Sequence, residues 1–363
     1  MMKFEYKKRL KDLNRLRVGT YREGASGLYL DRNERTVPFD EATRRQIAEV
    51  VAKASLNLYP DIPAFYRKLS KWLGVAESQL FITEGVSGAV KSLVETIAEP
   101  GDNIIFPTPT FAMYPVYCRM FDVEPRTFGY RADYSFDLDA MYGLIDKRTS
   151  TLFLPNPNVP IEGTLDIDKV AAIAERCRKE GVFLVMDEVY YPFGGPTASD
   201  LIDRYDNLLV MRSFSKAFGL AGIRLGYIIG SAEMMDYVSK IRTGYESNTA
   251  SIAIASLFMD NYNLVESYIG DIKNGLSFLK RELKKMGFDH NGGNASNFLF
   301  IRLGSPDIAR SVAAALAKRR IFIRAGWPEP FSDGISVTAA PADVMRTFVK
   351  ELSQAISSAK VES

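Results

Sequence analysis

The sequence predicts an α/β fold: a large domain built on a doubly wound, mostly parallel sheet, followed by a smaller α+β domain. Short β-rich runs alternate with amphipathic helical stretches from about residue 60 to 245, which is typical of a sheet whose strands are joined by helices. Continuous apolar runs such as VFLVM at 182–186 indicate strands buried on both faces, as in parallel sheets. The alternation stops after about residue 245, where we expect the second domain to begin.

Six candidate strands belong to the large domain. They are QLFITEG (79–85), DNIIFPTPT (102–110), STLFLPNPN (150–158), VFLVMDEVYY (182–191), NLLVMRSFS (207–215) and RLGYIIG (224–230). Between them, VSGAVKSLVETIAE (86–99) and IDKVAAIAERCRKEG (167–181) repeat apolar residues at the i, i+3, i+4 spacing of a helix. Gly181 closes the second helix with the residue that most often ends one.

The C-terminal part has a different order of elements. A long helical pattern over 251–287 is followed by candidate strands at 297–303, 321–326 and 335–340, with helices over 306–320 and 341–357. We therefore expect a large domain over 41–245 and a small domain over 246–363, preceded by an N-terminal segment at 1–40.

Composition excludes several classes of protein. Hydrophobic residues make up 47% and charged residues 25% of the 363 residues, and the formal net charge is +2, so neither nucleic acid nor a membrane is an expected partner. Cys118 and Cys177 fit no metal-ligand spacing and predict a reducing compartment. The N-terminus is charged and lacks the apolar core of a signal peptide. The expectation is a cytoplasmic protein without a metal site.

Reactive side chains gather where the predicted strands end, and parallel strands bring their carboxyl ends to one edge. A glycine turn at Gly85 opens a helix, whose first N–H groups form a ready anion site. An amine, a carboxylate and an anion site are what pyridoxal phosphate needs for its aldehyde, its ring nitrogen and its phosphate, and a phenol is expected at the same edge. The strand-end residues are Asn156, Asn158, Asp187, Tyr190, Ser213, Ser215 and Lys216.

Two motifs carry a resemblance to a known family: SFSKAFGLAGIRLG at 213–226 and DEVY at 187–190. Over about residues 25–355 the chain resembles fold-type-I pyridoxal-phosphate enzymes of the class I/II aminotransferase group, and within it is most similar to histidinol-phosphate aminotransferases. The resemblance implies a mostly parallel seven-stranded sheet in the large domain, a smaller α+β C-terminal domain, and an N-terminal segment, residues 1–40, that covers the active site.

The resemblance also assigns roles. Lys216 would form the Schiff base with pyridoxal 5′-phosphate and shuttle a proton, Asp187 would keep the ring nitrogen protonated, and Tyr190 would bind the ring O3′. Tyr59 would reach the phosphate of the neighbouring subunit, which implies a homodimer with shared active sites. The remaining residues expected at the cofactor are Gly85, Val86, Ser87, Phe111, Ser213, Ser215 and Arg224.

The first departure from the family pattern lies in NPNVPIEG. Val159 stands where the family has the asparagine that contacts O3′, and one residue is added before Gly163. Either Asn158 takes this contact from the adjacent position, or Tyr190 holds O3′ alone.

The second departure concerns the substrate. Gly334 stands where the family has the arginine that clamps the substrate α-carboxylate. Arg324 matches a second family arginine, which meets the distal or phosphate group, while Arg32 and Arg35 are additional cations of the N-terminal segment. Losing a bidentate arginine should change the substrate, so we expect one whose charge lies elsewhere, rather than histidinol phosphate or an ordinary α-amino acid bound in the usual way.

Three functions compete. The first is a ping-pong aminotransferase acting on a small amino donor and oxo acceptor, phosphorylated or otherwise anionic. The second keeps the cofactor and breaks another bond, as a decarboxylase of a phosphorylated amino acid resembling the threonine- and serine-phosphate enzymes. The third is a cofactor-binding regulator, which Lys216 and Asp187 disfavour because a structural site needs no electron sink. GLAGIRLG at 219–226 lacks the glycine order and acidic residue of a dinucleotide-binding loop, and His290 is expected in a turn.

Overall fold

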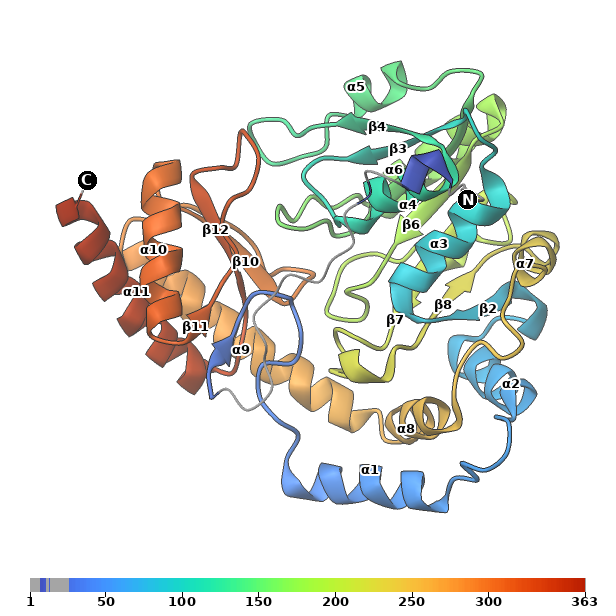
Figure 1. The fold of residues 1–363 in the computed structure, drawn as a ribbon, viewed down its shortest axis with the longest axis horizontal. Helices are drawn as coiled ribbons and strands as arrows, with labels where there is room; N and C mark the ends of the chain where they lie inside the picture. Colours follow the sequence, from blue (N-terminus) through green and yellow to red (C-terminus); the bar gives the residue numbers. More distant parts are fainter. Residues whose placement is uncertain (1–6, 11–12, 14–25, 363) are drawn as a thin grey trace, which may run out of the picture.

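The computed structural model describes residues 7–10, 13 and 26–362, and its centre is a seven-stranded sheet with the order β2-β8-β7-β6-β5-β3-β4 (Figure 1). β8 runs antiparallel to both of its neighbours, and the other four pairings are parallel. The predicted α/β fold with a mostly parallel sheet is therefore confirmed. The strands are β2 (Leu80–Thr83), β3 (Asn103–Pro107), β4 (Glu124–Phe128), β5 (Thr149–Pro155), β6 (Phe183–Asp187), β7 (Leu208–Ser213) and β8 (Gly226–Ile229).

The sheet is buried on both faces because successive side chains of a strand point to opposite sides. In β5, Leu152 and Leu154 pack into one hydrophobic cluster, while Phe153 between them packs into another. Helices α3 (Gly85–Ile97), α4 (Met113–Phe121) and α7 (Ala232–Ser239) cover the face of Phe153. α6 (Ile167–Glu180) and α2 (Ile62–Leu73) bury their apolar sides in the other cluster. The continuous apolar runs of the sequence follow from this double cover.

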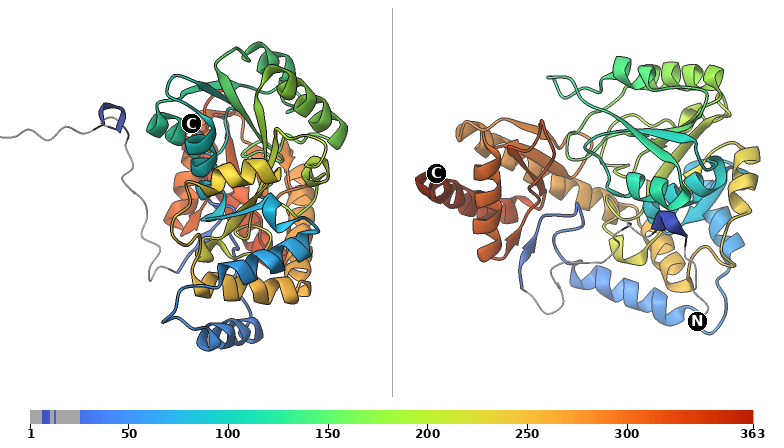
Figure 2. Two further views of the ribbon diagram at one scale, coloured as in Figure 1. Left: turned by 90° about the vertical axis from the view of Figure 1, so that its right-hand side faces the viewer. Right: turned by 45° about the horizontal axis from the view of Figure 1, so that its top comes forward.

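A smaller sheet of order β12-β10-β9 lies beside the large one and carries the C-terminal helices (Figure 2). The long helix α9 runs from the large sheet toward this part, where it packs against α11. A third, two-stranded sheet pairs β1 of the N-terminal segment with β11 in parallel. The elements are β1 (Leu28–Tyr29), α1 (Glu41–Lys53), α5 (Leu138–Gly143), α8 (Thr249–Asp260), α9 (Asn263–Lys285), β9 (His290–Gly292), β10 (Phe298–Arg302), α10 (Pro306–Lys318), β11 (Ile321–Phe322), β12 (Gly334–Thr338) and α11 (Ala342–Glu362).

The structure differs from the predicted elements in several places, including an edge strand, the position of His290 and one long helix. β4 has no predicted counterpart: it is an edge strand with a mostly exposed EPRTF sequence, so it lacks the apolar signal of the inner strands. His290, expected in a turn, lies in β9 opposite Ile301. The predicted helix over 251–287 is two helices, α8 and α9, separated at Asn261. None of the helices in the described ranges is long and apolar enough to cross a membrane.

Candidate active site

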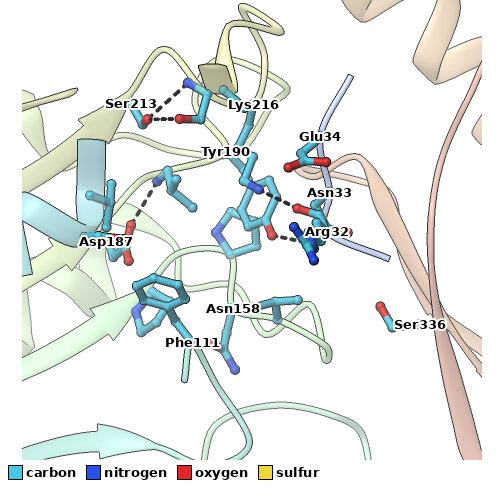
Figure 3. Close-up of a pocket in the computed structure, with 18 of the residues that line it drawn as sticks. Arg32, Asn33, Glu34, Phe111, Asn158, Asp187, Tyr190, Ser213, Lys216 and Ser336 are labelled. Atoms are coloured by element: carbon cyan, nitrogen blue, oxygen red, sulfur yellow. Dashed lines mark hydrogen bonds between the residues drawn. The ribbon is translucent and has the colours of Figure 1, made fainter. Parts of the chain in front are cut away.

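A cavity of about 500 Å³ opens at the carboxyl ends of β5, β6 and β7, where polar side chains from three parts of the chain face one another (Figure 3). The large sheet supplies the loops after these strands and the start of α3. The N-terminal segment crosses one side through residues 31–34, and the small sheet closes the far side through Arg324, Trp327 and Ser336. Residues separated by more than 300 positions therefore meet at the edge that the strand pattern predicts.

Lys216 is held in a rigid turn after β7. Its neighbours Phe214, Ala217 and Phe218 are buried, and the backbone N–H of Leu220 donates back to the carbonyl of Phe214 at 3.0 Å. The lysine Nζ reaches into the cavity and donates to the carbonyl oxygen of Arg32 at 2.8 Å. Desolvation lowers the pKa of this amine to about 8, so it loses its proton far more readily than a surface lysine.

Asp187 is the last residue of β6, and only 2% of it is exposed. Its carboxylate accepts the Tyr114 hydroxyl at 2.6 Å and the Val189 backbone N–H at 3.1 Å. Burial raises the pKa of Asp187 to about 6, although both hydrogen bonds oppose this shift. Such a carboxylate suits a cationic partner entering the cavity, because that partner would replace the hydration that burial removed.

Tyr190 follows three residues after Asp187 and is also buried. Its hydroxyl accepts the side-chain N–H of Asn33 at 2.7 Å. Burial raises the pKa of this phenol, so Tyr190 keeps its proton at neutral pH and can donate it into the cavity.

An anion site lies at the start of α3. Gly85 has φ +69°, and no side chain caps this helix, so N–H groups of its first turn are available. Arg224, itself left-handed at φ +53°, donates to the carbonyl of Glu84 at 3.1 Å, which places its guanidinium beside this turn. Ser213 donates to Ser215 at 2.8 Å. N–H groups, hydroxyls and an arginine together match what a phosphate requires.

The residues present therefore fit pyridoxal phosphate, with Lys216 placed for its aldehyde, Asp187 for its ring nitrogen and the start of α3 for its phosphate. Val86, Ser87, Phe111, Ser213, Ser215 and Arg224 all line the cavity, as expected for residues that hold the cofactor. Gly85 lies directly beside them, since a Cβ on it would be 3.1 Å from Nη2 of Arg224.

Asn158 lines the cavity, but its side-chain amide is already used. Its Nδ2 donates to the carbonyl of Pro109 at 2.8 Å and to the Tyr130 hydroxyl, and its Oδ1 accepts from Thr110 at 2.6 Å. Both amide protons are thus engaged, which leaves Tyr190 as the better placed donor for O3′.

Of the three arginines expected at the substrate, the structure places two at the cavity and one elsewhere. Arg32 and Arg324 line the cavity, whereas Arg35 lies outside it. The Arg35 guanidinium sits between the rings of Phe39 and Tyr268, 4.3 Å from each centroid. In a single chain Arg35 therefore packs against aromatic rings and does not line the cavity.

Tyr59 also lies away from this cavity in a single chain: it is 79% exposed and stacks on Tyr245 at 4.4 Å.

Gly334 has no room for a side chain. It begins β12, and a Cβ placed on it would lie 2.1 Å from Cζ of Phe300. Phe300 belongs to an aromatic cluster with Trp327 and Phe331 that is packed against the cavity wall. The Phe300 ring therefore occupies the space that a side chain at position 334 would need, and an arginine there would require Phe300 to move.

Several residues at the site have no counterpart in the sequence predictions, among them Asn33, Trp327 and Ser336, which line the cavity, and Tyr114, which binds Asp187. The signal for Tyr114 was its place three residues after Phe111, which brings both rings to one side of a helix start; they form an edge-to-face pair at 5.7 Å. The signal for Asn33 was weaker, because a single asparagine in the segment from Arg32 to Arg35 follows no local pattern that marks a site residue.

Comparison with known proteins gives one family and several relatives. The model of the family "Aminotransferase class I and II" matches residues 25–352. A histidinol-phosphate aminotransferase of Syntrophus aciditrophicus is 31% identical over 305 residues, covering 82% of this chain and 83% of the relative. The crystal structure of histidinol-phosphate aminotransferase from Sinorhizobium meliloti in complex with pyridoxal-5′-phosphate has a TM-score of 0.84 at 22% identity, covering 92% of this chain and 91% of that one. L-threonine-O-3-phosphate decarboxylase from Porphyromonas gingivalis has a TM-score of 0.75 at 19% identity, covering 90% and 98%. At these identities the two structures establish likeness of fold.

Proposed function

The chain belongs to the class I and II aminotransferase family and is a pyridoxal-phosphate-dependent enzyme, and from that premise we propose that it transfers an amino group to or from a small substrate with a phosphate or another distal anion. The observation that carries this proposal is Arg324, which lines the same cavity as Lys216 without an ion pair among the described residues. The relative's histidinol phosphate and the decarboxylase's threonine phosphate both carry a phosphate.

Arg324 is built to receive an anion. Its backbone is fixed by two hydrogen bonds with Ser336, at 3.1 and 2.7 Å, and its guanidinium lies 4.0 Å from the centroid of the Trp327 ring. Desolvation lowers the pKa of this arginine, and a ligand anion would offset that cost of burial. The Ser336 hydroxyl faces the same cavity. A cation and a hydroxyl on one wall suit a phosphate.

The cofactor, when bound, supplies the carbonyl that exchanges with the amino group and the ring that accepts electrons. The chain does the rest. Lys216, with its lowered pKa, would hold the cofactor and would then carry a proton to or from the substrate Cα. Asp187 would keep the ring nitrogen protonated, and Phe111, which lines the same cavity, would pack beside the ring. The N-terminal segment at residues 31–34 excludes water from this side of the cavity.

The test compares kcat/KM for phosphorylated and unphosphorylated substrate pairs in the wild type, in Arg324→Ala and in the control Arg310→Ala. Arg310 lies on the exposed side of α10, where it pairs with Asp307, so its loss removes the same charge outside the cavity. We expect the wild type to prefer the phosphorylated substrate and Arg324→Ala to lose about 10- to 100-fold on that substrate alone, since a hydrogen-bonded charge is worth about 1.5–3 kcal/mol. A wild type that prefers unphosphorylated substrates and is indifferent to Arg324 would contradict the proposal.

A second candidate function is decarboxylation of a phosphorylated amino acid. It is favoured by the closed position at Gly334, because the bond that breaks is the one held perpendicular to the cofactor ring, and an α-carboxylate without its arginine clamp is free to take that orientation. Carbon dioxide release from phosphothreonine or phosphoserine, with the cofactor unchanged at the end of the cycle, would favour this function over amino transfer.

We also propose that the enzyme is a homodimer in which Tyr59 completes the partner's site. The support is an exposed apolar patch formed by Leu56, Leu58, Tyr59 and Tyr245, which are 62%, 64%, 79% and 45% exposed. Patches of this kind often mark protein interfaces. We expect Leu56→Asp combined with Leu58→Asp to give monomers that bind the cofactor weakly, as measured by sedimentation and cofactor titration. An active wild-type monomer would contradict this arrangement.

A cytoplasmic location is the last part of the proposal. It is supported by Cys118 and Cys177, which are both buried as free thiols, the state expected in a reducing compartment. Burial raises the pKa of each thiol to about 12, so neither has the character of a reactive thiolate. Fractionation of cells that produce the protein at its natural level would test the location.

A further inference from the structure

We propose that Asn33 is a positioning residue that sets the direction of the Tyr190 hydroxyl, and thereby the proton that this phenol presents to the cavity. The inference rests on the proposed function, because that proton has a use only when a cofactor oxygen lies in front of it. It explains why Asn33 of the N-terminal segment is buried against Tyr190, which lies in the turn after β6, as Figure 3 shows.

The orientation of the Asn33 amide follows from Thr338. The backbone N–H of Asn33 donates to Oγ1 of Thr338 at 2.8 Å, and this same Oγ1 lies 3.0 Å from Oδ1 of Asn33. Since an amide oxygen has no proton, the Thr338 hydroxyl must donate there. Turning the amide around would leave the proton of this fully buried hydroxyl without a described acceptor, which is the costly arrangement for a buried polar group. Oδ1 is therefore the acceptor, and Nδ2 faces Tyr190.

The direction of the next bond follows from this orientation. Nδ2 of Asn33 lies 2.7 Å from the Tyr190 oxygen and can only donate. The phenol oxygen accepts that hydrogen bond, so its own proton is free to point into the cavity. Asn158, the other candidate donor to the cofactor oxygen, has both amide protons engaged elsewhere. The chain thus depends on Tyr190 for this contact, and Tyr190 depends on Asn33.

The backbone of Asn33 fixes the amide in place. Its φ of +54° is left-handed, a conformation that asparagine adopts more readily than most residues. The carbonyl of Asn33 accepts Nδ2 of Asn297 at 3.2 Å, and its N–H is held by Thr338. Thr338 ends β12, and Asn297 directly precedes β10. Residues of the small sheet and its entry therefore set the direction of the proton on Tyr190, which follows β6 of the large sheet.

The test uses variants that keep the backbone conformation and carry no added charge. Asn33→Gly removes the amide and accepts the left-handed φ. Thr338→Val removes the hydroxyl that orients the amide, and Thr338→Ser restores it. The measured quantity is the pKa of the lysine-linked cofactor, read from the absorbance of the bound cofactor against pH, which needs no turnover. A proton donated to the cofactor oxygen stabilises its anionic form, so losing this donor should raise that pKa.

We expect Asn33→Gly and Thr338→Val each to raise the pKa of the lysine-linked cofactor by up to about one pH unit, the size of one ordinary hydrogen bond, and Thr338→Ser to match the wild type. Tyr190→Phe should raise it at least as much, and adding Asn33→Gly to Tyr190→Phe should change nothing further. Two outcomes would overturn this inference and leave the proposed function intact. The first is a wild type that forms the lysine-linked cofactor while Asn33→Gly has the same cofactor pKa as the wild type. The second is that the pKa shifts of Asn33→Gly and Tyr190→Phe add fully in the double variant. A wild type that never forms the lysine-linked cofactor would overturn the proposed function as well.

Discussion

Replacing Asp187 with asparagine should stabilise the cofactor-free protein while disabling the enzyme. The carboxylate is 2% exposed at the end of β6, and its only described hydrogen-bond donors are Tyr114 and Val189. Burial outweighs these two hydrogen bonds and the charge of Lys216, which also favour the ionised form, so ionising Asp187 in the folded state costs free energy. Asparagine keeps the shape and one of the two acceptor oxygens, its NH2 group can donate to the Tyr114 hydroxyl oxygen, and it removes that cost.

The magnitude follows from the pKa of Asp187, which burial raises from 3.8 to about 6. Because each pKa unit corresponds to about 1.4 kcal/mol, the ionised carboxylate lowers the free energy of unfolding by about 3 kcal/mol above pH 6. The folded state binds the proton more tightly than the unfolded state, so this loss is absent below pH 3.8, grows as the pH rises to 6, and is constant above it. At pH 5 the loss should be about 1.6 kcal/mol.

The assay is urea unfolding of the cofactor-free protein at pH 5 and pH 8, followed by tryptophan fluorescence. Asp187→Asn should exceed the wild type by about 3 kcal/mol at pH 8 and by about half of that at pH 5. The matched control is the adjacent carboxylate, Glu188, which pairs with buried Arg212 at 2.9 Å. Glu188→Gln should destabilise by about 3–5 kcal/mol, because it leaves a buried charge unpaired. An Asp187→Asn protein no more stable than the wild type at pH 8, or a gain that does not shrink at pH 5, would refute the reasoning.

Three further predictions concern individual residues. Because desolvation lowers the pKa of Lys216 to about 8, the rate at which the protein captures the cofactor should rise about tenfold per pH unit below pH 8 and level off above it. Stopped-flow absorbance measures this rate, and a rate that does not change with pH would contradict the prediction. Tyr114→Phe removes the 2.6 Å hydrogen bond that stabilises ionised Asp187, so kcat should fall by about 10- to 100-fold with little loss of cofactor affinity, and unchanged steady-state turnover would rule out this role. Gly334→Ala should destabilise by about 1–3 kcal/mol because its Cβ meets the Phe300 ring at 2.1 Å, and Phe300→Leu should recover most of the loss in a double-mutant cycle; additive losses would argue against the clash.

The inner part of the fold was predictable because its signals are local. Each inner strand of the large sheet reads as an apolar run, and parallel pairing fixes where the strand ends meet. Lys216 and Asp187 were found from their motifs together with this rule, and the family and cofactor they indicated are confirmed by the family match over residues 25–352. The edge strand β4 escaped prediction because one side of it is exposed.

The parts of the site that escaped prediction depend on contacts distant in sequence. Asn33 acts through Thr338, 305 positions away, and no local pattern announces such a pair. Arg35 and Arg324 are both plausible anion binders by sequence, yet aromatic rings enclose the first and the cavity opens to the second. The packing of side chains from separate elements decides between them, and a linear pattern does not contain that information.

The measurement that tests the central claim most directly is a single half-reaction. The purified enzyme, loaded with pyridoxal 5′-phosphate and freed of excess, is mixed with glutamate, and the absorbance of the bound cofactor is followed while the products are counted. An aminotransferase should convert its cofactor from the aldehyde to the amine form and release one equivalent of 2-oxoglutarate per site without carbon dioxide, and Lys216→Ala should do neither. A cofactor that stays in the aldehyde form with every amino donor tried, phosphorylated donors included, while carbon dioxide is released, would contradict amino-group transfer.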